Sequence, residues 1–347
     1  MNALIPPVLT KKDFTSSQDP RWCPGCGDYA ILSTVQKVLP ELGIPKENIV
    51  WVSGIGCSSR FPYYVNTYGL HSIHGRALPI ATGIRVANPQ LSVWVATGDG
   101  DSLSIGGNHL LHCLRRNVNL RVLLFNNRIY GLTKGQYSPT SEQGKVTKSS
   151  PLGAADTPLD PFAFALGSGG TFFARTYDVA GDHLANILRR AASHRGTALI
   201  EILQNCSVFN DGAFDSVVDR STMAERQLRV EHGKPLRFGE RNHRGLTFDL
   251  ATLSLKVVDL ELEPAREPEL FVFDETNPAH GMLLSRLDPT QFPLPLGVLH
   301  ARQRPTYEDS LADQQAQASA KGPVGLNELF RSGNTWRVEP AEQPAAE

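Results

Sequence analysis

The chain has 347 residues, of which 41% are hydrophobic, and its formal net charge is −1 at pH 7. This length suits one large domain or two modest domains with a sizeable core. The near-neutral charge disfavours a broad nucleic-acid-binding surface, and no apolar run approaches the roughly 18 residues that a membrane span needs. The first residues do not resemble a signal peptide, so we expect the reducing cytoplasm as the compartment.

The N-terminal segment combines a polar arm with a pair of thiols. Residues 1–20 are polar and contain prolines, and we expect an extended arm there. Cys23-Pro24-Gly25-Cys26 follows, and its Pro and Gly favour a turn that can aim both sulfurs at one point. Apolar spacing then predicts a helix from Asp28, as the N-cap, to about Leu39.

Two loops in the next segment carry groups suited to a ligand. A strand predicted over 48–53 leads into a glycine-rich loop, 54–60, where Gly54 and Gly56 allow the backbone to approach a ligand closely. Three residues at the end of that loop can donate to an anion: Ser58, Ser59 and Arg60. The segment His74-Gly75-Arg76 precedes a helix predicted over about 79–87.

The most informative pattern lies in Val93–Thr133. An apolar run, 93–97, is followed by Gly98-Asp99-Gly100-Asp101, a helical pattern, and a second apolar run that ends in Asn126-Asn127. This order predicts a βαβ unit with parallel strands. Because the carboxyl ends of parallel strands meet at one edge, Asp99 and Asn127 can converge there. Their oxygens suit Mg²⁺ and the helix N-terminus suits an anion, so the pattern predicts a diphosphate site.

The rest of the chain extends the α/β pattern and then changes in composition. Residues 134–158 are rich in Ser, Thr, Gly and Pro, and we expect a mobile or partner-facing loop. Helices are predicted over about 161–166 and 179–193, and a strand over 197–203. We expect one domain over 21–215, a C-terminal extension over 216–308 that contacts another subunit, and a largely disordered tail over 309–347.

Four of the five cysteines lie in predicted loops or at strand ends: Cys23, Cys26, Cys57 and Cys206. Cys113 lies among the leucines of a predicted helix and reads as a core residue. Four thiolates can bind Zn²⁺ or a [4Fe–4S] cluster, and the CxxC can also be a redox pair or a turn with buried thiols. Cys57, however, lies in the loop expected to face the diphosphate ligand. That position favours an electron-transfer cluster over a structural zinc ion.

The spacing of GDG and NN resembles the thiamine-diphosphate motif, because 25 residues separate Gly100 from Asn126. This resemblance implies that Mg²⁺ binds to Asp99, Asn127 and the carbonyl of Ile129. A wider set of motifs resembles the β subunits of 2-oxoacid:ferredoxin oxidoreductases, and the 2-oxoglutarate type most closely. These motifs are CPGCG, GIGCSSR, HGRALPIATG, TGDGDSLSIGGNH, NNRIYGLTKGQYSPTS and NCSVFND, and they cover roughly residues 18–215.

The resemblance implies an α/β fold, namely the diphosphate-binding half of a thiamine-diphosphate enzyme, with a mostly parallel sheet and helices on both faces. The other half lies on a separate α subunit in this family, so an αβ or (αβ)₂ assembly is expected. The implied reaction is the coenzyme A-dependent oxidative decarboxylation of 2-oxoglutarate to succinyl-CoA and CO₂, or its reverse. Electrons would pass through one [4Fe–4S] cluster to ferredoxin.

The resemblance also implies a set of site residues. Cys23, Cys26, Cys57 and Cys206 would hold the cluster. Cofactor contacts would come from Ile55, Gly56, Cys57, Ser58, His74, Gly75, Arg76, Gly100, Asp101, Gly131 and Leu132. His74 is the local candidate for a catalytic donor to the substrate or an intermediate.

Three other hypotheses stay open at the level of the sequence. The first is the same chemistry on pyruvate or another 2-oxoacid, because the missing α chain contributes to substrate choice. The second is a thiamine-diphosphate carboligase subunit without a cluster, against which the four placed cysteines argue. The third is a non-catalytic, zinc-stabilised scaffold protein, in which the GDGD and NN pattern would be a coincidence.

Overall fold

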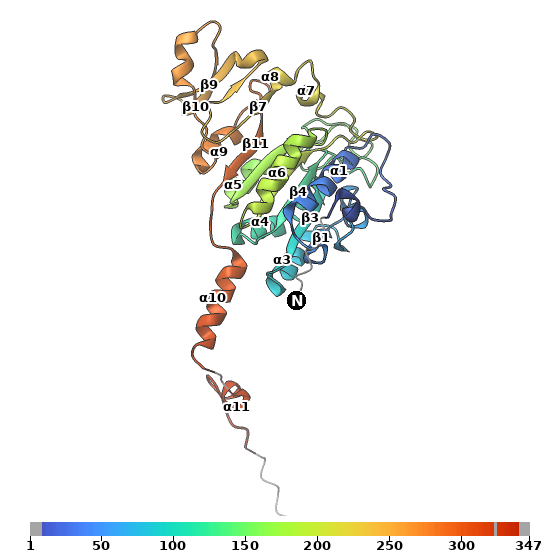
Figure 1. Cartoon of the computed structure of the whole chain (residues 1–347), viewed down its shortest axis with the longest axis vertical. Coiled ribbons are helices and arrows are strands. Elements are labelled where there is room, and N and C mark those ends of the chain that lie inside the picture. Colours follow the sequence, from blue (N-terminus) through green and yellow to red (C-terminus); the bar gives the residue numbers. More distant parts are fainter. Residues whose placement is uncertain (1–8, 323–324, 340–347) are drawn as a thin grey trace, which may run out of the picture. The chain divides into compact units, whose positions relative to one another are not determined.

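The computed structural model describes residues 9–322 and 325–339, and the chain divides into two compact units, 1–308 and 309–347 (Figure 1). Of the predicted N-terminal arm, residues 1–8 lie outside the described residues. Within the remainder, Lys11–Phe14 form a 3₁₀ turn, and the ring of Phe14 is fully buried.

An eight-stranded sheet organises the first unit. Its strands, in spatial order, are β2 (Tyr68–His71), β1 (Ile49–Ser53), β3 (Ser92–Gly98), β4 (Arg121–Asn126), β6 (Ala198–Leu203), β5 (Phe172–Tyr177), β11 (Leu294–Ala301) and β7 (Gln227–Arg229). The first six strands in this spatial order, β2, β1, β3, β4, β6 and β5, are all parallel to one another. Strand β11 pairs antiparallel with β5. The predicted mostly parallel sheet is therefore confirmed.

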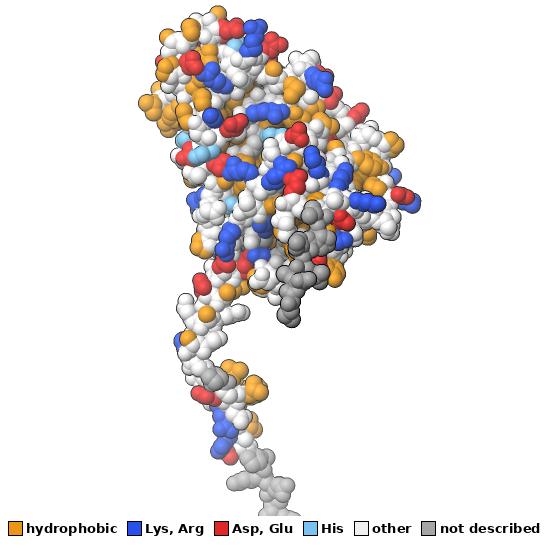
Figure 2. Space-filling view, in the orientation of Figure 1, with side chains coloured by type: hydrophobic (Ala, Val, Ile, Leu, Met, Phe, Trp, Pro, Cys, Tyr) orange, Lys and Arg blue, Asp and Glu red, His pale blue; other side chains and the backbone are white. Residues whose placement is uncertain are grey.

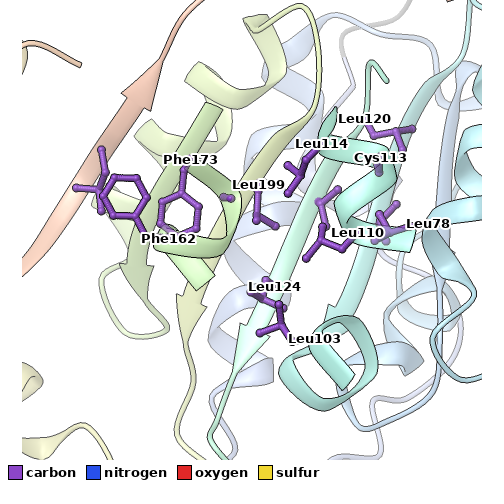
Figure 3. Close-up of a cluster of buried hydrophobic side chains, with 14 of the residues drawn as sticks. Leu78, Leu103, Leu110, Cys113, Leu114, Leu120, Leu124, Phe162, Phe173 and Leu199 are labelled. Carbon is purple, nitrogen blue, oxygen red and sulfur yellow. The ribbon is translucent and has the colours of Figure 1, made fainter. Parts of the chain in front are cut away.

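Helices cover both faces of this sheet. Those of the first unit are α1 (Asp28–Val38), α2 (Phe61–Tyr64), α3 (Ala77–Ala87), α4 (Gly107–Arg116), α5 (Pro161–Gly167), α6 (Gly181–Ser193), α7 (Asp215–Val218), α8 (Met223–Arg226) and α9 (Pro278–Ser285). Helices α1 and α6 pack side by side on one face (Figure 1). Helices α3, α4 and α5 cover the other face, where their apolar side chains form the cluster in Figure 3.

The apolar side chains of one strand pack alternately into two different cores, one on each face of the sheet. In β4, Val122 and Leu124 lie in the core under α3, α4 and α5, whereas Leu123 and Phe125 lie in the core under α1 and α6. Successive side chains of a strand point to opposite faces, so the middle of a strand that is buried on both faces is a continuous apolar run.

The predicted elements differ from the observed ones in a few places. Six strands were not predicted: β2, β5, β7, β8 (Arg237–Phe238), β9 (Arg244–Asp249) and β11. The helix after Gly100 starts with one π-helical turn, Asp101–Ile105, before α4 begins. The prediction of Asp28 as an N-cap is wrong, because Gly27 occupies that position and the Asp28 side chain is buried inside the first turn of α1.

The C-terminal extension adds a small antiparallel sheet, with β10 (Ser254–Asp259), β9 (Arg244–Asp249) and β8 (Arg237–Phe238) in that order. The tail contains helix α11 (Leu326–Phe330), and α10 (Tyr307–Ser319) extends into it. The predicted domain division, including the largely disordered tail, stays a prediction. No helix within the described residues combines the length and the apolar character needed to span a membrane.

A buried histidine at the end of α6 gives the fold a pH dependence. His194 is 4% exposed, and its Nε2 lies 2.9 Å from the Thr171 hydroxyl. Burial, with a smaller contribution from Arg121, lowers the pKa of His194 from 6.5 to about 4. Between pH 6.5 and pH 4, the unfolded chain binds a proton at this histidine and the folded chain does not. The free energy of unfolding therefore falls as the pH falls through this range, by an amount on the order of 3 kcal/mol.

We therefore expect His194→Gln to flatten the dependence of Tm on pH between 6.5 and 4.5. Thermal unfolding followed by circular dichroism at several pH values measures this slope. His232→Gln, at a side chain that is 53% exposed, serves as the control and keeps the wild-type slope. Equal slopes for His194→Gln and the wild type would contradict this origin of the pH dependence.

Candidate functional site

A cavity of about 180 Å³ lies where β1, β3 and β4 end, at the edge predicted for the diphosphate site. We call it the diphosphate cavity. The predicted site residues that line it are Ile55, Gly56, Cys57, Ser58, His74, Asp99, Gly100, Asp101, Asn127, Ile129, Gly131 and Leu132. Gly75 and Arg76 do not line this cavity. The Gly75 amide instead bonds to Asp101 Oδ1 at 2.7 Å, behind His74.

Asp99 is held in place by hydroxyls from the loop after β4. Its side chain is buried, and Oδ2 accepts hydrogen bonds from Ser138 Oγ and Thr140 Oγ1, both at 2.6 Å. Burial raises the pKa of the Asp99 carboxyl, and these two bonds oppose the rise. The residues around Ser138 are thus a buried support for Asp99, whereas the sequence suggested only a mobile or partner-facing loop.

The two adjacent asparagines have different environments. Asn126 is buried and donates to Glu201 Oε1 at 2.7 Å, and its Oδ1 lies 2.9 Å from Thr140 Oγ1. Asn127 lies at the cavity wall, where its Oδ1 accepts from the Ile129 amide at 3.2 Å. An oxygen-rich set of Asp99, Asn127 and the Ile129 carbonyl at one cavity has the donor chemistry that Mg²⁺ prefers.

Asp101 ties three loops together beneath the cavity. Its Oδ1 accepts from the amides of Ile55 at 3.0 Å and Gly75 at 2.7 Å, and lies 2.8 Å from His74 Nδ1. Its Oδ2 accepts from Thr97 Oγ1 at 2.6 Å. A carboxylate acceptor requires His74 Nδ1 to carry the proton, which leaves Nε2 free for a ligand in the cavity.

Two glycines make this close packing possible. A Cβ atom at Gly54 would lie 2.0 Å from Asp101 Oδ2, and one at Gly100 would lie 2.2 Å from the ring of Tyr130. The Tyr130 hydroxyl also donates to the Gly100 carbonyl at 3.0 Å. Any side chain at these positions would displace Asp101 or Tyr130, so both glycines are required by the geometry of the cavity.

The four predicted cysteine ligands line a second cavity of about 180 Å³, which we call the cysteine cavity. They are Cys23, Cys26, Cys57 and Cys206. The Sγ atoms of Cys206 and Cys57 lie 3.6 and 3.7 Å from the point where a Cβ atom on Gly131 would stand. The absence of a side chain at Gly131 therefore leaves room between these sulfurs.

The donor set of this cavity is four thiols. Within residues 9–322 and 325–339, no three His, Cys, Asp or Glu side chains are arranged to hold one metal ion. Four thiolates are the ligands that both a structural zinc ion and a [4Fe–4S] cluster use.

Burial dominates the electrostatics of this cavity. It raises the pKa of the Cys57 thiol to about 11 and raises that of Cys26 further, and in both cases Asp28 adds to the rise. Burial also raises the pKa of Asp28 itself to about 7; the charge of Asp178 adds to the rise, and an interaction with the Cys26 thiol opposes it.

The two cavities adjoin each other. Cys57, Asn127, Gly131 and Leu132 line both of them. A group bound on the cysteines would therefore lie next to a group bound in the diphosphate cavity.

Some residues of the site escaped prediction from the sequence. Ser138 and Thr140 belong to the SPTS segment, whose hydroxyls were quoted in a motif but given no role. Gln204, which is 1% exposed, lines the cysteine cavity and accepts a hydrogen bond from Asn127 Nδ2 at 2.9 Å. Its only signal was its position directly after a strand end and two residues before Cys206.

Comparison with known proteins agrees with this arrangement. Residues 50–202 match the family model described as thiamine pyrophosphate enzyme, C-terminal TPP binding domain. The chain is 52% identical over 339 residues to the 2-oxoglutarate oxidoreductase subunit KorB of Mycobacterium tuberculosis. That alignment covers 94% of this chain and 88% of the relative. The chain is 36% identical over 322 residues to 2-oxoacid:ferredoxin oxidoreductase 1, subunit beta, of Aeropyrum pernix, with 92% and 90% covered.

A solved structure is similar over the same length. It is described as the 2-oxoglutarate:ferredoxin oxidoreductase from Magnetococcus marinus with 2-oxoglutarate, coenzyme A and succinyl-CoA bound. The TM-score is 0.75 at 32% sequence identity, and the match covers 94% of this chain and 97% of that chain.

We expect Asp99→Ala to abolish Mg²⁺-dependent binding of thiamine diphosphate, because the substitution removes the only carboxylate among the three predicted ligands. Isothermal titration with and without Mg²⁺ measures the loss. Asp182→Ala, on the exposed first turn of α6, is the control that keeps wild-type binding. Undiminished, Mg²⁺-dependent binding in Asp99→Ala would refute the predicted role of Asp99.

Proposed function

This chain belongs to the β subunits of the 2-oxoacid:ferredoxin oxidoreductases, and we propose that its enzyme oxidatively decarboxylates 2-oxoglutarate to succinyl-CoA and CO₂, or runs the reverse reaction. The observation that carries this proposal is the shared wall of the two cavities, formed by Cys57, Asn127, Gly131 and Leu132. A site for diphosphate next to a site for an electron-transfer cluster matches a decarboxylation that must release electrons one at a time to ferredoxin.

The residues of the diphosphate cavity fit thiamine diphosphate and Mg²⁺. Asp99, Asn127 and the Ile129 carbonyl would bind the metal, while Ser138 and Thr140 orient Asp99. When bound, thiamine diphosphate supplies the electron sink that makes loss of CO₂ feasible. The protein contributes orientation, a cavity with little water, and charge compensation through the metal ligands.

His74 is the proposed donor to the substrate from this chain. Its Nδ1 is held by Asp101, which fixes the ring and presents Nε2 to the cavity. With its Nδ1–H fixed on Asp101, the neutral ring accepts a proton at Nε2, and the doubly protonated ring donates that proton from the same defined atom.

The four cysteines of the second cavity would hold one [4Fe–4S] cluster. Their shared cavity, and its position beside the diphosphate cavity, support this assignment. All five cysteines are free thiols, which is consistent with the reducing cytoplasm that we propose as the compartment.

The α subunit is the proposed partner at the mouth of the diphosphate cavity. Leu132, which lines the cavity, is 42% exposed, and Ile73, the sequence neighbour of the lining residue His74, is 72% exposed. Exposed apolar side chains beside a cofactor cavity indicate a protein interface. Figure 2 shows Lys and Arg interspersed with Asp and Glu on the drawn face, without a single broad basic surface.

We expect the anaerobically purified αβ complex to reduce a viologen dye when 2-oxoglutarate and coenzyme A are both present. Pyruvate and branched-chain 2-oxoacids, assayed in parallel, test the substrate. Reduction with pyruvate in place of 2-oxoglutarate would contradict the proposed substrate but keep the mechanism. Thiamine-dependent activity without any dye reduction would favour the carboligase hypothesis instead.

A pair of cysteine variants tests the cluster assignment. We expect Cys206→Ser to lower the iron content and abolish dye reduction, because it removes one of four thiolate ligands. Cys113→Ala keeps both, since Cys113 is 3% exposed and packs in the core between α4 and the sheet (Figure 3). Unchanged iron in Cys206→Ser, or iron lost in Cys113→Ala, would show that a different set of cysteines binds the cluster.

A further inference from the structure

One buried amide connects the two cavities directly. Gln204 follows β6, and its Oε1 accepts from Asn127 Nδ2 at 2.9 Å. Its Nε2 donates to Cys26 Sγ at 3.4 Å and also to the Asn205 carbonyl. The side chain therefore touches a predicted Mg²⁺ ligand at one end and a predicted cluster ligand at the other.

The surrounding groups fix which way this amide points. The Asn205 carbonyl can only accept, so the nitrogen of Gln204 must face it and the neighbouring Cys26 sulfur. Asn127 Oδ1 accepts from the Ile129 amide, so Asn127 Nδ2 faces Gln204 and requires an oxygen there. The reversed amide would place donor against donor and acceptor against acceptor at a position that is 1% exposed.

We propose that Gln204 is a positioning residue for both sites, which holds Asn127 Oδ1 towards the metal and donates a hydrogen bond to the sulfur of Cys26. This inference rests on the proposed function, because it takes Asn127 as a Mg²⁺ ligand and Cys26 as a cluster ligand. Gln204 itself contacts neither the substrate nor the reacting atoms.

Each end of the amide has its own physical consequence. An N–H donor at a ligating sulfur stabilises the more negative, reduced state of a cluster and so raises its reduction potential. A partner that orients a metal ligand typically changes metal affinity by about 10–100-fold when it is removed. Gln204 therefore links the affinity of one site and the potential of the other through a single side chain.

Two variants of similar size separate the two roles. Gln204→Glu keeps an oxygen that accepts from Asn127 but loses the donor to Cys26. Gln204→Met loses both interactions. Gln227→Met is the matched control, because Gln227 is also buried and donates to a backbone carbonyl, that of Val217, away from both cavities.

The measurements use the full αβ complex. Redox titration followed by EPR gives the midpoint potential of the cluster, and isothermal titration gives the affinity for Mg²⁺ and thiamine diphosphate. We expect a lower potential in both Gln204 variants, at least a tenfold loss of affinity in Gln204→Met alone, and wild-type values in Gln227→Met.

Unshifted potentials in both Gln204 variants, or wild-type affinity in Gln204→Met, would overturn the inference. If the variants fail to load iron, isothermal titration still tests the role of Gln204 at Asn127, because the affinity for Mg²⁺ and thiamine diphosphate can be measured on the cluster-free complex. An iron-free wild-type complex would overturn the proposed function together with this inference, whereas a loaded wild type with unshifted variants would overturn this inference alone.

Discussion

The parallel pairing of β1, β3, β4 and β6 is the constraint on which both cavities depend. Parallel strands end at the same edge of the sheet, so the four loops that follow them meet although they are far apart in the sequence. The loops after β1, β3 and β4 form the diphosphate cavity, and the loop after β6 brings Gln204 and Cys206 to the cysteine cavity. The two sites adjoin because neighbouring strands supply them.

Buried polar groups then give these loops one arrangement. Asp101 holds the backbone of Ile55 and Gly75 together with the ring of His74, and Asp99 takes its support from two hydroxyls of the loop after β4. A buried carboxylate is costly unless its oxygens are paired, so a change in one loop is transmitted to the others. Groups that these hydrogen bonds hold in place need not be ordered when a ligand binds, which lowers the cost of orienting the ligand.

Much of this architecture could be predicted from the sequence, for identifiable reasons. Strands β1, β3, β4 and β6 are mostly apolar and lead into short loops with Gly, Asp, Asn or Cys, so both their existence and their chemistry were visible. Strand β5 was missed because its run, FFARTY, contains Arg175, whose charge is masked by Glu201 and Asp160 only in the folded chain. Ser138, Thr140 and Gln204 were missed as support residues because their roles depend on contacts with Asp99, Asn127 and Cys26 that no local pattern reveals.

The central claim is that electrons leave the diphosphate cavity through the cysteine cavity beside it. The most direct test is EPR spectroscopy of the anaerobic αβ complex, frozen after 2-oxoglutarate and coenzyme A are added without ferredoxin. The account predicts the signal of a reduced [4Fe–4S] cluster that requires the substrate and is lost in Cys57→Ser, whose wild-type side chain lines both cavities. Release of CO₂ and formation of succinyl-CoA with no substrate-dependent cluster signal would contradict it.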